Sequence, residues 1–206
     1  MTFTINQGSY DWLQDRVGYA TASRFKDVMG RLKSGAPNQA CKDYLADVVC
    51  ERLTGQPVKT YANEAMRWGT EMEPEARQAY MIKTGRTVDE VSFLKHPTMM
   101  AGASPDGIVE LEGLIEIKCP NSTTHQTTLL EGMNEDHLYQ IQGQLWITGY
   151  DWCDFVSYDP RMPKGLDLYV QRVPRNDSFI TQLESGVREF LALVDERVEA
   201  LRRRVA

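Results

Sequence analysis

The sequence predicts an α/β fold, in which a central mixed sheet of about five strands is flanked by helices. Apolar residues recur at the spacing of amphipathic helices over residues 38–54, 63–84, 136–148 and 177–205. Shorter apolar runs, typical of strands, occupy residues 87–94, 108–111, 114–118, 152–158 and 166–173. The chain shows no repeat, no low-complexity tract and no long linker, so we expect residues 1–206 to form a single domain.

The bulk composition limits the class of protein. With 206 residues, of which 42% are hydrophobic, the chain is long enough to bury one sizeable core. No apolar run approaches the length of a membrane span and the N-terminus lacks a basic-then-apolar signal, so we expect a soluble, cytoplasmic protein. Cys41, Cys50, Cys119 and Cys153 show no paired zinc spacing, and we expect them to be reduced and partly buried.

The net charge of −6 is unusual for a protein that binds nucleic acid, since Lys and Arg supply most of the affinity for phosphates. Two interpretations are open. Either a local basic channel lies on an acidic body, or the substrate is not a nucleic acid. The composition favours the second interpretation, and the candidate site residues described below favour the first.

The N-terminal segment predicts two helices. Ser9 is suited to cap a short helix that ends at Asp15, and a second helix begins near Ser23 and runs to about Leu32. Arg16 and Ser23 lie near the start of the second helix, where free backbone N–H groups and the helix dipole favour an anion. A simpler interpretation treats Ser23 as a helix cap and Arg16 as a solvated surface charge.

The two central helices have typical cap residues: Asn38, Gly55, Asn63 and Gly85. Glu73 is a carboxylate at the border of the core-facing stripe of the helix over residues 63–84. An alternative is a capping box formed by Thr70 and Glu73, in which Pro74 is tolerated because it lies near a helix start. Both interpretations of Glu73 are open from the residues alone.

The stretch after the second central helix predicts a hairpin. Residues 104–107, Ser-Pro-Asp-Gly, are typical of a turn, and a short strand, a two-residue turn at 112–113 and a second strand over 114–118 follow. Alternate side chains of a strand share a face, so Glu116 and Lys118 point together to one side. The isoleucines between and beside them point the other way, into apolar packing.

Asp106 lies at the start of this hairpin, so its carboxylate converges with that of Glu116. Two such carboxylates make an all-oxygen site of the kind that Mg²⁺ or Mn²⁺ prefers. Lys118 beside them is suited to hold or deprotonate the water that such a metal activates. The alternative is an ordinary ion pair of Glu116 with Lys118 on a solvated face, worth under about 1 kcal/mol, with Asp106 serving only the turn.

The C-terminal half supplies the rest of the predicted sheet. Residues 121–126 are expected to form a polar loop. The helix over 136–148 carries Gln140 and Gln144 together on one side, which usually indicates a solvated face. Two strands and the last helix, with the bounds given above, complete the chain.

Several motifs resemble a known family. Asp106 with Glu116-Ile117-Lys118 resembles the PD-(D/E)xK nuclease signature. The longer runs SPDG and EIKCP, the upstream RWGTEMEPEAR and the downstream YDPRM resemble the phage lambda exonuclease (YqaJ-type viral recombinase) family, in order and from about Arg16 to about Tyr169. The resemblance implies a restriction-endonuclease-like core for the predicted sheet.

The resemblance also implies roles for individual residues. It places Glu73 in the active site as a third carboxylate and Gln140 next to the catalytic centre, and we expect the Ile117 carbonyl as a further metal ligand. The expected catalytic residues are Glu73, Asp106, Glu116, Lys118 and Gln140. The expected ligands of Mg²⁺, for which Mn²⁺ should substitute, are Asp106, Glu116, Ile117 and Glu73.

For DNA phosphate we expect contacts from Arg16, Ser23, Ser104 and His125. The first two belong to the run RVGYATAS, which resembles the family segment whose Arg and Ser hold phosphate near the 5′ end. The lambda enzyme has an Arg shortly after its E-x-K-C-P run, and this chain has Thr124 there. We therefore expect a weaker terminal-phosphate pocket, or His125 as the substitute, charged below roughly pH 6.5.

The resemblance implies Mg²⁺-dependent hydrolysis of linear double-stranded DNA from the 5′ end, which leaves 3′ single strands for recombination. It also implies a homotrimer around DNA, a partner protein that anneals single strands, and a phage or prophage origin with action in a bacterial host. Two alternatives stay open: a structure-specific or restriction-type endonuclease, and a non-catalytic module that binds DNA ends. A covalently closed circle separates the two nucleases, because an exonuclease needs an end.

Overall fold

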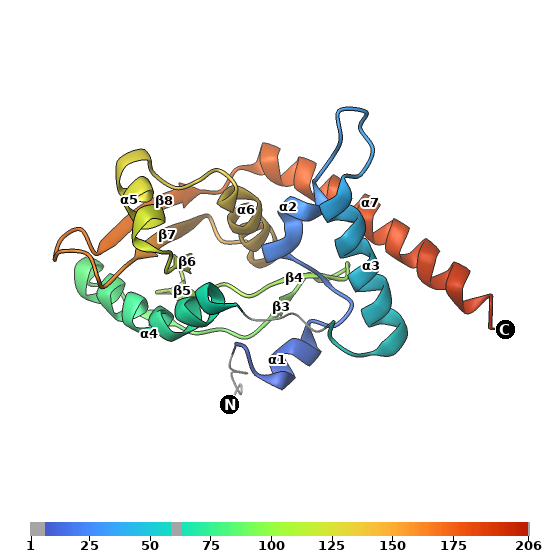
Figure 1. The fold of residues 1–206 in the computed structure, drawn as a ribbon, viewed down its shortest axis with the longest axis horizontal. Coiled ribbons are helices and arrows are strands. Elements are labelled where there is room, and N and C mark those ends of the chain that lie inside the picture. The colour runs from blue at the N-terminus through green and yellow to red at the C-terminus, as the bar shows by residue number, and fades with distance from the viewer. Residues whose placement is uncertain (1–6, 59–62, 206) are drawn as a thin grey trace.

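The computed structural model describes residues 7–58 and 63–205 (Figure 1). Its centre is a five-stranded sheet in the order β2 (Val88–Asp89), β5 (Gly107–Val109), β6 (Gly113–Lys118), β7 (Trp152–Tyr158) and β8 (Leu168–Pro174). β6 and β7 run parallel and the other neighbours run antiparallel, so the sheet is mixed. The predicted α/β fold with a mixed sheet of about five strands is confirmed.

A second, three-stranded sheet joins β1 (Ala20–Thr21), β4 (Ala101–Ala103) and β3 (Leu94–Lys95). The prediction of one strand over 87–94 is wrong, because this segment divides between the two sheets. Val88 pairs with Val109 of β5, whereas Leu94 pairs with Ala103 of β4. The alternation of side chains along a segment identifies it as extended but does not encode which strand it pairs with.

Several helices begin and end close to where the sequence predicts. They are α1 (Tyr10–Asp15), α3 (Gln39–Thr54), α4 (Glu64–Thr84), α6 (His137–Thr148) and α7 (Asp177–Arg202). The side chains of Ser9, Asn38 and Asn63 each accept a backbone N–H from the first turn of the following helix. Gly55 and Gly85 end α3 and α4 with φ of 66° and 72°, a left-handed conformation that glycine adopts without steric cost.

The helix predicted from Ser23 to Leu32 is much shorter in the structure. Ala22–Arg24 form a 3₁₀ turn, η1, and Phe25–Val28 form a single short helix, α2. Both end residues of α2 are fully buried, so tertiary packing and not helix length holds this segment. Ser23 therefore lies in a turn, and the helix-dipole argument for an anion at this position does not apply.

Two details of the site region also differ from the prediction. The expected polar loop at 121–126 is instead the start of α5 (Ser122–Glu131), whose N-cap Asn121 accepts the N–H of Thr124. The hairpin turn occupies 110–112, because Val109 pairs directly with Gly113. Glu110 and Leu111 take positive φ values of 52° and 59° to close this turn.

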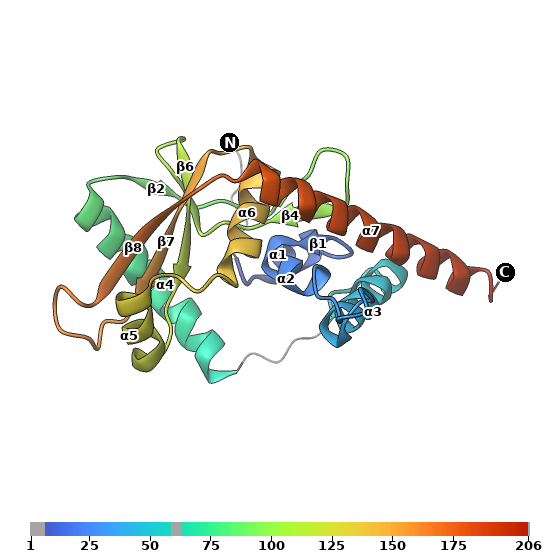
Figure 2. The ribbon, with the colours of Figure 1, turned by 90° about the horizontal axis from the view of Figure 1, so that it is seen from above.

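Helices cover both faces of the five-stranded sheet (Figure 2). On one face, Ala76 and Tyr80 of α4 pack with Ile115 and Ile117 of β6, and all four side chains are buried. On the other face, Ile141 and Leu145 of α6 pack with Leu114 of β6 and Phe155 of β7. Burial of each such side chain stabilises the fold by about 1.5–3 kcal/mol. β6 is thus clamped between α4 and α6, which fixes the direction of its charged side chains.

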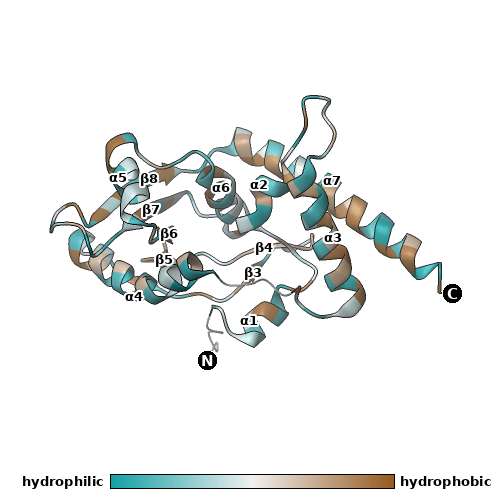
Figure 3. Ribbon diagram, viewed as in Figure 1, coloured by the Kyte–Doolittle hydropathy of each residue, from teal (hydrophilic) through white to brown (hydrophobic). Residues whose placement is uncertain are grey.

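A third apolar cluster joins α2, α3 and α7 to β4 beside the main sheet. Tyr44 of α3 stacks on Phe190 of α7 with ring centroids 5.2 Å apart. The apolar stripe of α7 appears in Figure 3 as brown segments that alternate with teal along the helix. Gly143 lets α6 approach α2 closely, since a Cβ there would lie 2.4 Å from the ring of Phe25. This packing brings the N-terminal segment against the sheet that carries the site.

No helix within residues 7–58 and 63–205 is long and apolar enough to cross a membrane. All four cysteines are free, as predicted: Cys41, Cys119 and Cys153 are buried and Cys50 is exposed. Burial raises the pKa of the Cys119 thiol to about 12, so this neighbour of Lys118 is not a reactive thiolate.

Candidate active site

β6 carries the two charged side chains at the centre of the site. Glu116 and Lys118 face α6, while the isoleucines that alternate with them pack against α4. Glu116 is only 1% exposed, and its Oε1 accepts a hydrogen bond from Lys118 Nζ at 2.5 Å. The alternative of an ordinary ion pair on a solvated face is therefore wrong, because the carboxylate is buried.

Two glutamines of α6 form hydrogen bonds with Glu116 and Lys118. Gln144 Nε2 donates to Glu116 Oε2 at 2.6 Å, and Lys118 Nζ donates to Gln140 Oε1 at 3.3 Å. Both carboxylate oxygens of Glu116 thus accept hydrogen bonds, one from the strand and one from the helix. Such surrounding contacts orient a ligand carboxylate before anything binds to it.

Asp106 lies opposite Glu116 across the hairpin, just before the pair formed by Gly107 and Ile115. Its Oδ2 accepts the backbone N–H of Ile117 at 2.6 Å, so the main chain of β6 sets the direction of the carboxylate. Burial raises the pKa of Asp106 well above its ordinary value, and the negative charges of Glu116 and Glu73 raise it further. Burial and the neighbouring carboxylates therefore both favour the neutral form of Asp106 as long as no cation is bound.

Glu73 reaches the cluster from α4. Its Oε1 accepts a hydrogen bond from Arg77 at 2.6 Å, and Arg77 also binds Glu90 at 2.6 Å. Burial raises the pKa of Glu73. The positive charge of Arg77 lowers this pKa in part, and the negative charge of Glu116 raises it further. The capping-box interpretation is wrong, because α4 begins at Glu64 and the Thr70 hydroxyl donates to the Met66 carbonyl inside the helix.

The charge state of Lys118 follows from its neighbours. Burial lowers the pKa of Lys118, but Glu116, Asp106 and Glu73 together outweigh burial and raise the pKa above its ordinary value. Lys118 is therefore an ammonium ion at neutral pH. An ammonium ion is suited to orient a water molecule, and the expected role of Lys118 in deprotonating that water stays a prediction.

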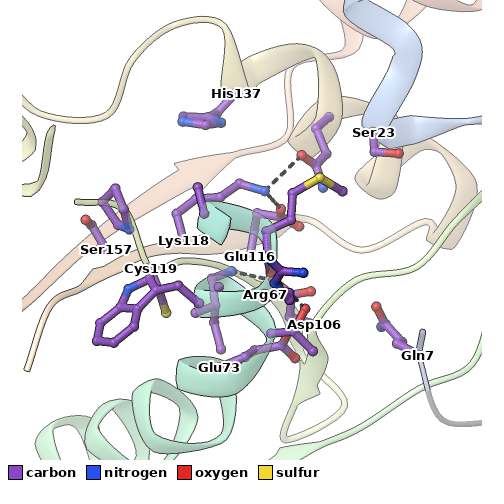
Figure 4. Close-up of a pocket in the computed structure, with 18 of the residues that line it drawn as sticks. Gln7, Ser23, Arg67, Glu73, Asp106, Glu116, Lys118, Cys119, His137 and Ser157 are labelled. Carbon is purple, nitrogen blue, oxygen red and sulfur yellow. Dashed lines mark hydrogen bonds and ion pairs between the residues drawn. The ribbon is translucent and has the colours of Figure 1, made fainter. Parts of the chain in front are cut away.

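All of these groups open into one cleft with a volume of about 1120 Å³. The predicted site residues that line it are Arg16, Ser23, Glu73, Ser104, Asp106, Glu116, Ile117, Lys118 and Gln140. Figure 4 shows Glu116, Lys118 and Asp106 at the floor of the cleft, with Ser23 and Glu73 at its sides. Arg67 and Arg161 line it as well, so the cations of the cleft lie among carboxylates, of which Glu64 and Glu71 stand at its edge on α4.

The donor atoms of this floor suit a divalent cation with a preference for oxygen. Asp106 and Glu116 supply two carboxylates that lie opposite each other across the hairpin. In the part of the chain that the structure describes, no three His, Cys, Asp or Glu side chains form a ready cage for a metal. Arg77 engages only Oε1 of Glu73, so the other oxygen of Glu73 is available with backbone carbonyl and water oxygens to complete a ligand set of the kind that Mg²⁺ prefers.

The expected phosphate contacts on the N-terminal side centre on Trp12. The guanidinium carbon of Arg16 lies 3.9 Å from the centroid of the Trp12 ring, and burial lowers the pKa of Arg16. The indole Nε1 of Trp12 donates to Ser104 Oγ at 3.0 Å. The Ser23 hydroxyl lies 3.4 Å from Thr21 Oγ1. Trp12 therefore links Arg16 and Ser104 at one side of the cleft.

The prediction that His125 contacts a terminal phosphate is wrong. His125 is 0% exposed and does not line the cleft. Its Nδ1 lies 2.7 Å from Ser157 Oγ, and its Nε2 lies 2.8 Å from the Leu166 carbonyl oxygen. With both ring nitrogens engaged inside the protein, His125 joins α5 to β7 and to the loop before β8. The unexpected helix α5 is the cause, since it turns this side chain inward.

Gln144 is the residue that the sequence did not reveal. Its spacing from Gln140 placed both amides on one side of a helix, but that pattern usually indicates a solvated face. In the structure Gln144 is 1% exposed, and its Oε1 is buried with no hydrogen-bond partner among the described residues. Only the packing of α6 on β6 makes a buried amide out of this pattern.

Known proteins resemble this chain in sequence and in fold. The YqaJ-like viral recombinase domain matches residues 11–151. The crystal structure of an alkaline exonuclease, LHK-Exo from Laribacter hongkongensis, has 43% sequence identity and a TM-score of 0.87, covering 96% of this chain and 98% of that one. The same protein has also been solved in complex with dAMP, with the same identity, coverage and TM-score.

More distant proteins share the fold or part of the sequence. A phage-related exonuclease from Haemophilus somnus 129PT has the same fold, with a TM-score of 0.70 and 15% identity over 91% of this chain and 96% of that one. The protein ExoD of Escherichia coli (strain K12) is 33% identical over 67 residues, which are 32% of this chain and 75% of that one. The chain therefore belongs to the YqaJ-like viral recombinase family and is a homologue of an exonuclease.

Proposed function

We propose that the protein is a Mg²⁺-dependent exonuclease that hydrolyses the phosphodiester bonds of linear double-stranded DNA from the 5′ end. The observation that carries this proposal is the half-buried Asp106 and the buried Glu116 beside the Lys118 ammonium, in a cleft that Arg16 also lines. The 43% identity with LHK-Exo, an alkaline exonuclease that has been solved with dAMP, supports a DNA substrate.

Asp106 and Glu116 would hold the metal, and the Ile117 carbonyl and Glu73 would support it. When bound, Mg²⁺ supplies Lewis-acid polarisation of the phosphate and activation of water. The contacts of Gln144 and Ile117 keep the two carboxylates in place, so little reorganisation is needed before the reaction. Mn²⁺ should substitute, because it accepts the same oxygen ligands.

Lys118 contributes positive charge and hydrogen-bond donors at the same point. Its ammonium group already donates to Glu116 and Gln140, and three N–H bonds are available to it. The remaining donor can orient the attacking water or a phosphate oxygen. An ammonium fixed where negative charge develops stabilises the transition state more than the bound substrate.

The 5′ end of the duplex would be held on the N-terminal side of the cleft. Arg16 is suited to this role because its guanidinium is stacked on Trp12 and its N–H groups fit a phosphate. Ser23 and Ser104 would add hydroxyl donors. Since Thr124 stands where the family has an Arg and His125 is buried, we expect weak discrimination between 5′-phosphoryl and 5′-hydroxyl ends.

The pH dependence should favour alkaline conditions. The pKa values of Asp106 and Glu73 are raised, and both carboxylates must be ionised to hold a cation. The active form therefore becomes more populated as the pH rises, and the rate should fall as the pH drops through the raised pKa of Asp106.

The test uses linear duplex DNA labelled at the 5′ or the 3′ end, with a covalently closed circle of the same sequence. With Mg²⁺ we expect early release of the 5′ label, late release of the 3′ label and survival of the circle, and no reaction in EDTA. Cleavage of the circle would favour the endonuclease. Retention of bound but intact DNA ends with both Mg²⁺ and Mn²⁺ would favour a binding module.

We also propose a homotrimer and a single-strand annealing partner, both of which rest on the resemblance to the lambda exonuclease family. The mass of the protein in solution by light scattering tests the trimer. A mass of one 23.5 kDa chain at micromolar concentration, with or without duplex DNA, would contradict it.

A further inference from the structure

Arg67 is a cation of the cleft for which the proposed function has no role so far. It lies at the N-terminal end of α4, where its backbone N–H bonds to the Asn63 carbonyl oxygen at 3.1 Å, and it lines the same cleft as Asp106 and Lys118. Figure 4 shows its side chain pointing toward Asp106 at the cleft floor. Within the described ranges, its guanidinium forms no ion pair and no hydrogen bond.

Arg67 is exposed, and Glu64 and Glu71 lie one turn before and after it on α4 without forming an ion pair with it. The N-terminus of a helix carries partial positive charge, so acidic residues stabilise the first turns and basic residues destabilise them. The other long cations of α4 are compensated, since Arg77 binds Glu73 and Glu90 and Lys83 binds the Leu168 carbonyl oxygen. Arg67 differs from these two because its exposed guanidinium lines the cleft and is available to an anion there.

The other cations that line the cleft already have partners. Lys118 binds Glu116 at 2.5 Å, and Arg161 binds the buried Asp159 at 2.7 Å. Arg16 lies over Trp12, and Arg161 also lies over an aromatic ring. Among the described cations of the cleft, Arg67 is the one with neither a carboxylate nor an aromatic partner. Its partner is therefore expected to be an anion that enters the cleft.

We propose that Arg67 binds a non-bridging oxygen of the phosphate that is hydrolysed, an inference that rests on the proposed function. Asp106, Glu116 and Lys118 mark the place of the reaction, and Arg67 points to that place from α4. A guanidinium presents N–H donors in a planar fork that fits two phosphate oxygens. The positive end of the α4 dipole adds to the attraction.

The chemistry assigns Arg67 a role in the transition state. In the reaction, the oxygen of water bonds to phosphorus, the bridging oxygen leaves, and the proton of water passes to solvent or to that oxygen. Negative charge rises on the non-bridging oxygens, and Arg67 stabilises it without exchanging a proton. Arg16 and Ser23 come from the N-terminal segment and would hold a different phosphate.

The experiment measures single-turnover cleavage at saturating duplex, with matched 5′-phosphoryl and 5′-hydroxyl ends. Arg67→Ala should lower the rate constant about 10²-fold on both substrates, as for the loss of one electrostatic donor, and Arg67→Lys should recover part of it. The thermal melting temperature should stay the same or rise, because an unfavourable charge leaves the helix N-terminus. Arg197→Ala, an exposed arginine of α7, is the matched control and should match wild type.

Three results would overturn the inference. An unchanged rate constant with weaker DNA binding alone would make Arg67 a general backbone contact. A loss confined to 5′-phosphoryl ends would place it at the terminal phosphate. A lower melting temperature that accounts for the lost activity, in both Arg67→Ala and Arg67→Lys, would make it structural. Failure of the wild-type protein to cleave linear duplex with Mg²⁺ would instead refute the proposed function itself.

Discussion

Two sets of carboxylates lie on or next to the central sheet, all of them buried except the half-buried Asp106, and they differ in how their charge is neutralised. Asp154 of β7 accepts hydrogen bonds from Tyr80 at 2.7 Å and from Arg172 at 2.8 and 2.9 Å. Asp159, just after the same strand, accepts two from the Arg161 guanidinium at 2.7 and 3.1 Å. Glu116 lies on β6, the neighbour of β7, and Asp106 lies at the start of β5, one strand further. Among the described residues, one cation, the Lys118 ammonium group, donates to Glu116 and lowers the pKa of Asp106.

The pKa values follow this difference. Burial raises the pKa of Asp159, but hydrogen bonds from Arg161 and Ser122 outweigh it and bring the pKa to about 2. Burial also raises the pKa of Asp106, and there Glu116 raises it further. A carboxylate with its counter-charge inside the chain stabilises the fold, whereas one without it is available to a cation from solution. Neutralisation, and not burial, separates the structural carboxylates from the candidate catalytic ones.

Asp106→Asn has the largest expected effect on the reaction. A metal ion contributes several kcal/mol of transition-state stabilisation, so loss of this ligand charge should slow hydrolysis about 10³-fold. Stability should change in the opposite direction. Folding raises the pKa of Asp106, so the fold favours the protonated carboxyl group. The contribution of Asp106 to the free energy of unfolding is therefore present at low pH and is lost as the pH rises through the raised pKa. The variant should therefore melt at a higher temperature than wild type at neutral pH without metal.

Asp154→Asn is the matched substitution in a carboxylate that an arginine of the chain already neutralises. Hydrolysis per folded molecule should stay near wild type, while the free energy of unfolding falls by roughly 2 kcal/mol because a charge-assisted contact is lost. Initial rates and chemical denaturation in EDTA measure both properties. If both variants lost stability to the same extent, the proposed distinction between the two sets of carboxylates would fail.

Lys118→Ala removes the ammonium group that donates to Glu116 and lies near enough to Asp106 to lower its pKa. We expect the rate to fall about 10²–10⁴-fold, the range for a lost group that donates to the reacting atoms. Lys118 lowers the pKa of Asp106, so its removal should also move the acidic limb of the pH–rate profile to higher pH. The pH–rate profile of Lys118→Ala, which should be weakly active, is measured with Mn²⁺ as well as Mg²⁺ to check this shift of the acidic limb. An unshifted acidic limb would show that Asp106 does not control it.

Gln144→Leu should weaken metal binding by about 10–100-fold, the usual effect of removing a contact that orients a metal ligand. Gln142→Leu is the control, because Gln142 is equally buried on α6 but binds the Pro174 carbonyl oxygen and the Asn176 N–H instead. Calorimetric titration with Mn²⁺ separates the two. Similar losses of affinity in both variants would mean that general damage to α6, and not the contact with Glu116, is responsible.

His125→Ala has the smallest expected effect on the reaction. It removes two internal hydrogen bonds and should lower the free energy of unfolding by about 2 kcal/mol. The ratio of rates on 5′-phosphoryl and 5′-hydroxyl ends should stay unchanged between pH 6 and pH 8. If the ratio of the two rates rose toward pH 6 in wild type and stayed constant in the variant, His125 would contact the terminal phosphate after all.

Much of the local structure was predictable because it depends on neighbours in sequence. Cap residues such as Asn38 and Gly85 set helix ends through hydrogen bonds and backbone conformations a few residues long. The two-residue period of a strand placed Glu116 and Lys118 on one face, and the hairpin brought Asp106 opposite them. The short helix α2 and the displaced hairpin turn show the limit of such signals where packing competes with them.

The sequence by itself determined which residues are the candidates for the chemistry and that Glu116 and Lys118 share a strand. The tertiary structure alone decided that Gln144 reaches Glu116, that Arg77 holds Glu73, that His125 is buried, and that residues 87–94 serve two sheets. The physical reason is that charge neutralisation, desolvation and strand pairing depend on distances between segments far apart in the chain. Local periodicity is the same whether a polar face meets water or a buried carboxylate, and only the packing of α6 on β6 distinguishes the two.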